Sequence, residues 1–300
     1  MGLKRMSSGK VASGYQKPSS NRFTRSRAGN FFLFVILIAA GLFSVLPLIY
    51  AVATSFKPLD ELLIFPPRFF VSRPTLSNYR ILPDLMASLT VPLSRYIYNS
   101  ITVSTVTTAL YVIISSMAAF SLSKGNYKYK NLIFWCIQFA LMFNAYTLSI
   151  PQYLIFSKLG IIDTYAAYIL PQLAATLGVF LIKQYIEGYV PDALLEAAKI
   201  DGASNYRIYA QIIMPMIKPA WLTLTLFMFR DVWAAVPNGT VFSEKIKTLP
   251  QIVTQVTAGG TARAGSSMAL TVIMMIPPIL VYLISQSNVV EAMSSAGIKE

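Results

Sequence analysis

Long runs of residues without charge constrain the fold of this chain more than any other feature of its sequence. A helix that crosses a membrane needs about 20 apolar residues, and hydrocarbon offers no partners to unpaired backbone groups, so such runs form helices. The sequence has five uninterrupted apolar runs and a sixth run, Pro219–Val236, that is interrupted only by Arg230 and Asp231. We therefore predict an all-α, polytopic membrane protein with six transmembrane helices. The uninterrupted runs are Ala28–Phe56, Tyr96–Ser123, Asn131–Ser157, Thr164–Ile182 and Ala264–Val290.

The composition agrees with this class, since 55% of the residues are hydrophobic and only 12% are charged. The net charge of +13 follows the positive-inside rule and does not form a basic face for nucleic acid. We expect residues 1–29, rich in Ser, Gly, Lys and Arg, to be a disordered basic cytoplasmic tail, followed by a retained first span. Six crossings then place both termini in the cytoplasm. The basic residues thus indicate a multi-pass protein of the cytoplasmic (plasma) membrane, in contact with anionic lipid.

Several classes of chemistry are excluded by residues that the sequence lacks. Histidine is absent and Cys136 is the only cysteine, which rules out histidine catalysis, internal disulfides and a metal site of the usual ligand types. No G-x-x-x-x-G-K-[ST] pattern occurs, so the chain has no P-loop for a nucleotide. We expect a protein that is not an enzyme, holds no cofactor or metal, and takes its energy from another chain.

A polar, amphipathic segment, residues 188–218, separates the fourth and fifth apolar runs. Asp192 is expected to cap a first helix of good helix formers. Gly202 then offers positive φ for a tight turn, and Ser204 can cap a second helix that ends near Pro215. The predicted helix-turn-helix is a compact knob. The alternative, an amphipathic helix lying on lipid headgroups, explains neither the internal glycine nor the spacing of the residues around it.

Within this segment, Glu196-Ala197-Ala198 is followed after three residues by Gly202, and after nine more by Ile212-Ile213-Met214-Pro215. This resembles the EAA loop of binding-protein-dependent ABC importer permeases, with only Met214 departing from the usual leucine. The resemblance implies a cytoplasmic coupling loop that a separate ATPase grips. Glu196 would offer an anion to the ATPase groove, Gly202 the turn, and the alanines a close helix approach. The implied ATPase-coupling residues are Glu196, Ala197, Ala198, Asp201, Gly202, Ala203, Ile212 and Pro215.

The resemblance extends over roughly residues 30–300, the expected transmembrane domain. These residues are similar to the carbohydrate (maltose-type) family of permeases. In the outer loop, 57–95, Ser72–Arg80 resembles a P-T-x-x-N-Y segment of carbohydrate-type permeases. Ser243–Pro250 resembles the outer-loop T-L-P element of the same family. Phe227–Ala235 keeps only the tryptophan of a W-N-x-F-like segment. The ending Gln286–Glu300 looks like the Gram-positive branch for polysaccharides and complex oligosaccharides. We expect the outer loop to be a small structured cap.

The resemblance implies a permease subunit of an ABC importer that moves an oligosaccharide across the membrane. Its implied partners are a second homologous permease, two ATPase subunits that bind ATP and Mg²⁺, and an extracellular, lipid-anchored solute-binding protein. Two alternatives stay open: an ABC permease for a non-sugar solute such as an amino acid or peptide, and a secondary transporter. A secondary transporter should show buried carboxylates and repeat symmetry, whereas Asp231 is the only carboxylate within a predicted span.

Ionisable residues inside a span are costly and usually functional, which singles out Arg230 and Asp231. Adjacent helical residues point about 100° apart, so we do not expect the two to pair well with each other. They either line a substrate path, with Arg230 donating to sugar hydroxyls or a uronate, or form an interhelical salt bridge. Sugar sites combine aromatic faces with planar polar groups, although bundle packing explains each such residue equally well. The candidates for the substrate path are Asn144, Tyr146, Gln152, Gln172, Arg230, Asp231 and Trp233.

Overall fold

The computed structural model describes residues 27–87, 91–143, 147–237 and 239–296, and every regular element in these ranges is a helix. The chain divides into two compact units, residues 1–48 and 49–300. Helix α1 (Arg27–Ser55) begins in the first unit and ends in the second. Residues 1–26 of the predicted basic tail and the last four residues of the predicted family-like ending lie outside the described residues. The last three residues of the predicted tail, 27–29, begin α1 and are helical instead of disordered. All packing and sites below belong to the second unit.

Within the described residues, four helical stretches are long and apolar enough to cross a membrane, and a strongly bent pair of helices would make a fifth. The bent pair joins residues 205–216 to α13 at an angle of 80°. One of the four is broken between α8 and α9. The bounds of these elements are α1 (Arg27–Ser55), α5 (Leu93–Lys124), α8 (Ala166–Leu173), α9 (Leu177–Tyr189), α13 (Lys218–Ala234) and α15 (Ala264–Ala296).

The structure does not have one continuous helix over the predicted third span, Asn131–Ser157. The structure has α6 (Lys130–Ala140) and α7 (Ser149–Leu159) there, each 11 residues long. At 1.5 Å per residue, neither helix alone matches a hydrocarbon core of about 30 Å. Pro151 lies in the first turn of α7, where its missing N–H is tolerated. A proline at this position favours the start of a new helix over the continuation of an old one.

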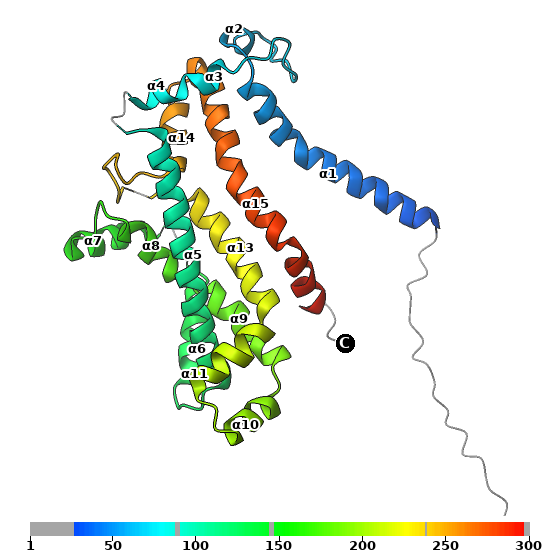
Figure 1. Cartoon of the computed structure of the whole chain (residues 1–300), viewed down its shortest axis with the longest axis vertical. Coiled ribbons are helices and arrows are strands. Elements are labelled where there is room, and N and C mark those ends of the chain that lie inside the picture. Colours follow the sequence, from blue (N-terminus) through cyan, green and yellow to red (C-terminus); the bar gives the residue numbers. More distant parts are fainter. Residues whose placement is uncertain (1–26, 88–90, 144–146, 238, 297–300) are drawn as a thin grey trace, which may run out of the picture. The chain divides into compact units, whose positions relative to one another are not determined.

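Helix α5 is the centre of the bundle, because it packs against α8, α9 and α13, and α13 packs in turn against α15 (Figure 1). Its buried face carries small side chains such as Ser115, Ser116 and Ala119, which let helix backbones approach closely in lipid. It also contacts α9 directly, where the backbone N–H of Gly178 donates to the Tyr111 hydroxyl at 2.8 Å. A side chain on residue 178 would occupy the space of that phenol.

The described part of the loop over residues 57–95, which leaves out residues 88–90, contains short helices held by hydrogen bonds. The buried Glu61 carboxylate accepts the Ser72 N–H at 2.8 Å, and this bond holds the pKa of Glu61 below its ordinary value. The Asn78 amide donates to the Ser55 carbonyl at 2.9 Å and to the Lys57 carbonyl at 2.7 Å. These bonds fold the loop back onto the end of α1. Its helices are α2 (Leu59–Leu62), α3 (Ser77–Arg80) and α4 (Leu82–Ala87), and further along the chain come α14 (Leu249–Thr257) and η2 (Thr261–Arg263).

Candidate functional site: a helix-turn-helix loop and a polar cavity

The turn predicted at Gly202 is present and has a defined hydrogen-bond pattern. Helix α10 (Asp192–Ile200) ends there, and Gly202 adopts φ +78°. The Gly202 N–H donates to the Lys199 carbonyl at 3.0 Å, and the Ala203 N–H reaches back to the Ala198 carbonyl at 2.9 Å. This pair of bonds is a Schellman motif, which needs a left-handed residue that glycine adopts without steric cost. The prediction of positive φ at Gly202 is confirmed.

The start of α10 differs from the prediction, because Pro191 is the N-cap and Asp192 is the first helical residue. The Asp192 carboxylate makes no capping bond and instead accepts from the Lys124 ammonium at 2.7 Å. The same ammonium donates to the Val190 carbonyl at 2.7 Å. The bond from Lys124 holds the pKa of Asp192 below its ordinary value. Because Lys124 is the last residue of α5, this contact ties the loop to the central helix.

The second half of the loop begins as predicted and ends later than predicted. Ser204 caps α11 (Asn205–Ile208) by accepting the Arg207 N–H at 3.3 Å. The chain continues through a π-helix, η1 (Tyr209–Ile213), and then α12 (Met214–Met216). Pro215 does not end the helix, because it lies in the first positions of α12, where a missing N–H is tolerated. The 80° bend into α13 follows Met216.

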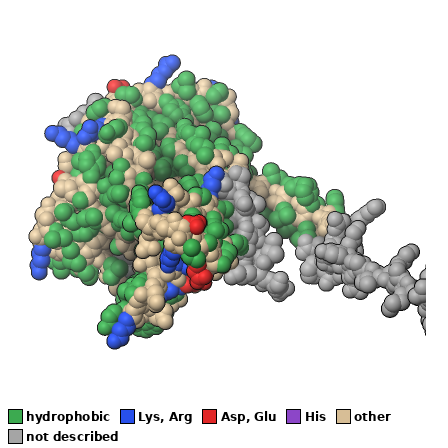
Figure 2. All heavy atoms as spheres, turned by 60° about the horizontal axis from the view of Figure 1, so that its bottom comes forward, with side chains coloured by type: hydrophobic (Ala, Val, Ile, Leu, Met, Phe, Trp, Pro, Cys, Tyr) green, Lys and Arg blue, Asp and Glu red, His purple; other side chains and the backbone are tan. Residues whose placement is uncertain are grey.

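The predicted coupling residues divide between an exposed and a buried side of the loop. Glu196, Ala197, Asp201, Gly202 and Pro215 are exposed, whereas Ala198 is buried and Ala203 and Ile212 are partly buried against the core. The loop therefore presents an acidic and small-residue surface while two of its alanines pack inward. Figure 1 shows α10 at the end of the bundle, and Figure 2 brings that end forward, where basic and acidic side chains gather beside hydrophobic ones.

Two apolar residues of this loop that are exposed in the structure were not singled out from the sequence. Ile200 is 85% exposed and Tyr206 is 76% exposed, one on each side of the Gly202 turn. The two side chains add apolar area to the exposed surface of a polar loop. The pattern of the motif does not include either position. Their signal in the sequence is only that bulky apolar residues flank the turn.

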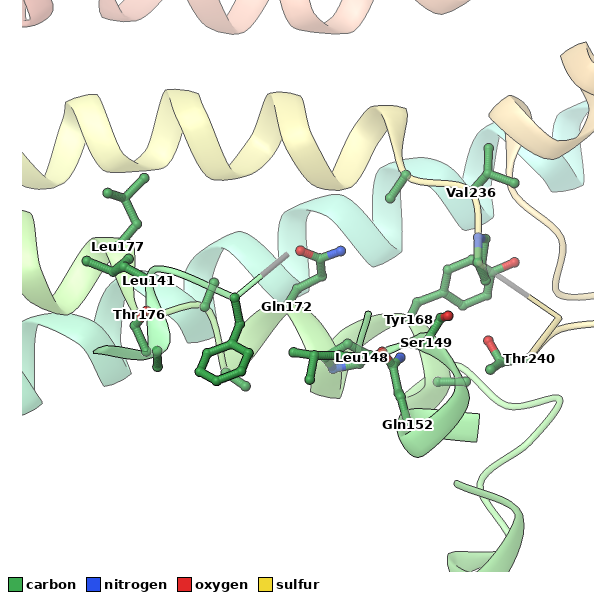
Figure 3. A pocket seen from close by; sticks show the side chains of 18 residues that line it. Leu141, Leu148, Ser149, Gln152, Tyr168, Gln172, Thr176, Leu177, Val236 and Thr240 are labelled. Carbon is green, nitrogen blue, oxygen red and sulfur yellow. The ribbon is translucent and has the colours of Figure 1, made fainter. Parts of the chain in front are cut away.

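A cavity of about 490 Å³ brings together two of the predicted substrate-path residues. Gln152 comes from α7 and Gln172 from α8, and the break between α8 and α9 supplies Thr176. In Figure 3 both glutamines lie along the cavity with Tyr168, while Thr176 and Thr240 lie toward opposite ends. The cavity thus combines amides, hydroxyls and an aromatic ring. Asn144 and Tyr146, also predicted for the path, lie outside the described residues.

The wall of this cavity is supported by a loop that the prediction did not connect with it. Asp163, at φ +59°, donates its N–H to the Thr240 carbonyl at 2.9 Å. Its carboxylate accepts the N–H groups of Phe242 and Ser243 at 2.9 and 2.8 Å. The Tyr168 hydroxyl donates to the Ile246 carbonyl at 3.2 Å. These bonds fix the segment before α14 beside the cavity.

The expectation that Arg230 and Asp231 do not pair with each other is wrong. The Arg230 guanidinium donates to Asp231 Oδ1 at 2.8 and 3.0 Å. The long arginine side chain bends back to its neighbour and overcomes the angle between adjacent helical positions. Both side chains are more than half exposed in this chain, at 65% and 54%. Arg230 lines a second, smaller cavity of about 270 Å³ together with Phe227 and Tyr282, and that cavity includes neither glutamine.

Trp233 belongs to the core of the bundle. Its side chain is 2% exposed, its indole N–H donates to the Met274 carbonyl at 2.9 Å, and its ring stacks on Phe229. These contacts join α13 to α15. The structure therefore brings Gln152 and Gln172 together, and it places Arg230, Asp231 and Trp233 elsewhere.

Known proteins resemble this chain over most of its length. The sulfoquinovosyl glycerol transport system permease protein SmoH of Agrobacterium fabrum is 29% identical over 287 residues, which cover 94% of this chain and 97% of the relative. The arabinooligosaccharides transport system permease protein AraQ of Halalkalibacterium halodurans is 29% identical over 281 residues, with 89% and 94% covered.

A solved structure shares the fold. The crystal structure of a bacterial ABC transporter involved in the import of the acidic polysaccharide alginate has a TM-score of 0.68 at 23% identity, and the match covers 88% of this chain and 98% of that chain. Residues 111–295, which include the Gly202 turn, match the family described as the binding-protein-dependent transport system inner membrane component. With its apolar helices and this match over more than half of its length, the chain belongs to that family of membrane permease components, which are transport subunits and not enzymes.

Proposed function

We propose that this chain is the permease subunit of an ABC importer that carries an oligosaccharide across the cytoplasmic membrane. The cavity with Gln152, Gln172 and Tyr168 is the observation that carries the proposal. Planar amides and hydroxyls can hydrogen-bond sugar hydroxyls, and a cavity of this size lies in the range of small-molecule sites. The names of the relatives, which specify arabinooligosaccharides and sulfoquinovosyl glycerol, support a sugar as cargo.

The proposed organisation follows the sequence. Residues 1–29 form a cytoplasmic tail and residues 30–300 the transmembrane domain, with the loop 57–95 outside and the loop 188–218 inside. The chain crosses the membrane six times, the broken stretch α6–α7 supplies the third crossing, and both termini are cytoplasmic. The basic residues of the first 27 positions support this orientation through the positive-inside rule.

Coupling to ATP takes place at the loop from α10 to α12. Its exposed acidic, small and apolar residues dock into a groove of an ATPase subunit, which binds ATP and Mg²⁺. The complete importer contains a second permease, two ATPases and an extracellular solute-binding protein. Lys124 supports this mechanism, because it joins Asp192 and the Val190 carbonyl to the end of α5. A movement of the loop is thus passed to the helix on which the bundle is packed.

Deleting this chain from its native cell is expected to reduce ATP-dependent uptake of an oligosaccharide to background, because its partner permease then has no second half. The measurement is accumulation of radiolabelled neutral and acidic trisaccharides, with a plasmid copy of the chain as the control that restores uptake. Unchanged uptake of every sugar, together with lost uptake of an amino acid or peptide, would contradict the proposed cargo.

Single cysteines test the proposed orientation in a Cys136→Ala background. Ser77 and Asn205 are both exposed in the structure, so a difference in labelling reports the side of the membrane and not burial. In intact cells, Ser77→Cys is expected to react with a membrane-impermeant maleimide, and Asn205→Cys only after the cells are permeabilised. Labelling of Asn205→Cys from outside would remove the loop from any contact with a cytoplasmic ATPase.

A further inference from the structure

We propose that the cavity between α7, α8 and the segment after α13 is a subsite for an uncharged sugar unit and excludes uronates. The proposal rests on the proposed function, since it specifies which sugars the path accepts. It is carried by the charges around the cavity, by the hydrogen bonds that its polar groups can offer, and by the position of Arg230.

No charged side chain of the described residues lines the cavity. Its 18 lining residues, all within the part of the chain that the structure describes, include no Asp, Glu, Lys or Arg. Residues 144–146 and 238, next in sequence to lining residues, are Asn, Ala, Tyr and Asn, so they bring no charge either. A carboxylate that enters such a site loses its water without gaining an ion pair, which is costly. A sugar ring with only hydroxyls meets no such cost.

The polar groups of the cavity suit hydroxyls. Each of the two amides, of Gln152 and Gln172, offers two N–H donors and one carbonyl acceptor, and Thr176 adds a group of both kinds. A sugar hydroxyl also donates and accepts, so it can satisfy both parts of an amide, whereas a carboxylate can only accept. The hydroxyl of Tyr168 is already bonded to the Ile246 carbonyl, so this residue contributes its ring to the cavity wall.

The charges next to the cavity wall are of both signs, and none of them is among the lining residues. Lys245 and Lys247 flank Ile246, and Lys247 is paired with Glu244. Asp163 is bonded to the segment that carries Thr240 and presents its carboxylate to the Phe242 and Ser243 amides. It places a negative charge beside the cavity. The cation that the sequence suggested for a uronate, Arg230, is paired with Asp231 and lines a different cavity. This chain therefore offers a carboxylate no cation among the lining residues of the cavity.

Protection of a single cysteine tests the proposal in the complete importer in membrane vesicles. Gln172→Cys, in the Cys136→Ala background, is labelled with N-ethylmaleimide in the presence of maltotriose, xylotriose, arabinotriose or trigalacturonate. A neutral trisaccharide is expected to slow labelling by roughly tenfold when it exceeds its Kd about tenfold, because the free fraction of the site falls as 1/(1 + [L]/Kd). Trigalacturonate is expected to leave the rate unchanged. Leu226→Cys, in the second cavity, is the control that no sugar protects.

Charged thiol reagents give a second measurement that needs no sugar. A cationic and an anionic methanethiosulfonate are compared at the same two cysteines. The cation-to-anion rate ratio is expected to be higher at position 172, whose cavity is lined by no charged residue, than at position 226, which shares its cavity with Arg230. A lower ratio at position 172 would overturn the electrostatic basis of the proposal.

The outcomes separate this inference from the proposed function through uptake by the Cys136→Ala parent importer. Protection by trigalacturonate equal to that by a neutral sugar would overturn the selectivity while sugar transport stands. If the parent takes up a trisaccharide that protects neither Gln172→Cys nor Ala174→Cys, a variant in the same cavity that keeps both amides, the cavity is not its site. If a parent importer that hydrolyses ATP takes up no sugar at all, the proposed function itself fails.

Discussion

Replacing Gly202 by valine is expected to uncouple this permease from its ATPase while leaving the chain inserted in the membrane. Gly202 has φ +78°, and a Cβ on it would meet no atom within 4 Å. The effect therefore comes from backbone strain and not from a clash. A β-branched residue in this region costs about 1–3 kcal/mol, which corresponds to roughly 5- to 150-fold in an equilibrium such as docking. The measurements are co-purification of the ATPase and oligosaccharide uptake, each normalised to permease in the membrane.

Two matched variants separate the turn from general damage. Gly202→Asn should retain most of the coupling, because asparagine tolerates left-handed conformation better than other non-glycine residues. Gly160→Val is the control for strain elsewhere, since Gly160 has φ +67° with equally open space around it and follows α7 instead of α10. It should leave ATPase association unchanged. Normal coupling by a well-expressed Gly202→Val variant would contradict the docking role of this turn.

The features of the loop that could be predicted are those set by a few neighbouring residues. A glycine after a run of helix formers and a serine before the next helix are enough to place a left-handed turn and an N-cap, and the structure has both. Asp192 shows the limit of this reasoning, because its partner, Lys124, is 68 residues away in sequence. A capping bond is the local choice, and a tertiary ion pair replaces it.

The span pattern could be predicted only where apolar length decides the structure. The third run is long enough for one helix, yet it forms two, because length does not report where a helix starts and Pro151 suits a first turn. The cavity depends on this break. It takes Gln152 from α7, Gln172 from α8 and Thr240 from the segment after α13, so no window of sequence contains it. The residue types could suggest the two glutamines as sugar-binding residues, but they could not show that Arg230 lies outside this cavity. Its pairing with Asp231 depends on the conformation of one long side chain.

A glycine within the bundle carries the other large expected effect. Gly178→Ala should destabilise the folded protein, because the added Cβ would lie 2.7 Å from the Tyr111 hydroxyl oxygen and 2.9 Å from Leu224 Cδ2. The phenol cannot easily move away, since Tyr111 is 2% exposed and its hydroxyl accepts the Gly178 N–H. Overpacking of this kind costs about 1–3 kcal/mol, and leaving the buried N–H without its partner costs about 1–3 kcal/mol more.

The experiment compares Gly178→Ala with Gly41→Ala in detergent solution. Gly41 lies in α1 with nothing within 4 Å of a Cβ, so its alanine variant should match or exceed the parent, because alanine in a helix interior is favoured over glycine by about 1 kcal/mol. Gly178→Ala should show a lower Tm and a lower yield of monodisperse protein. Tyr111→Phe, which removes the hydrogen bond without adding volume, should fall between the two. If Gly178→Ala is as stable as Gly41→Ala, then α5 and α9 are not packed as closely as the structure has them, and the bundle that positions both the coupling loop and the cavity must be arranged differently.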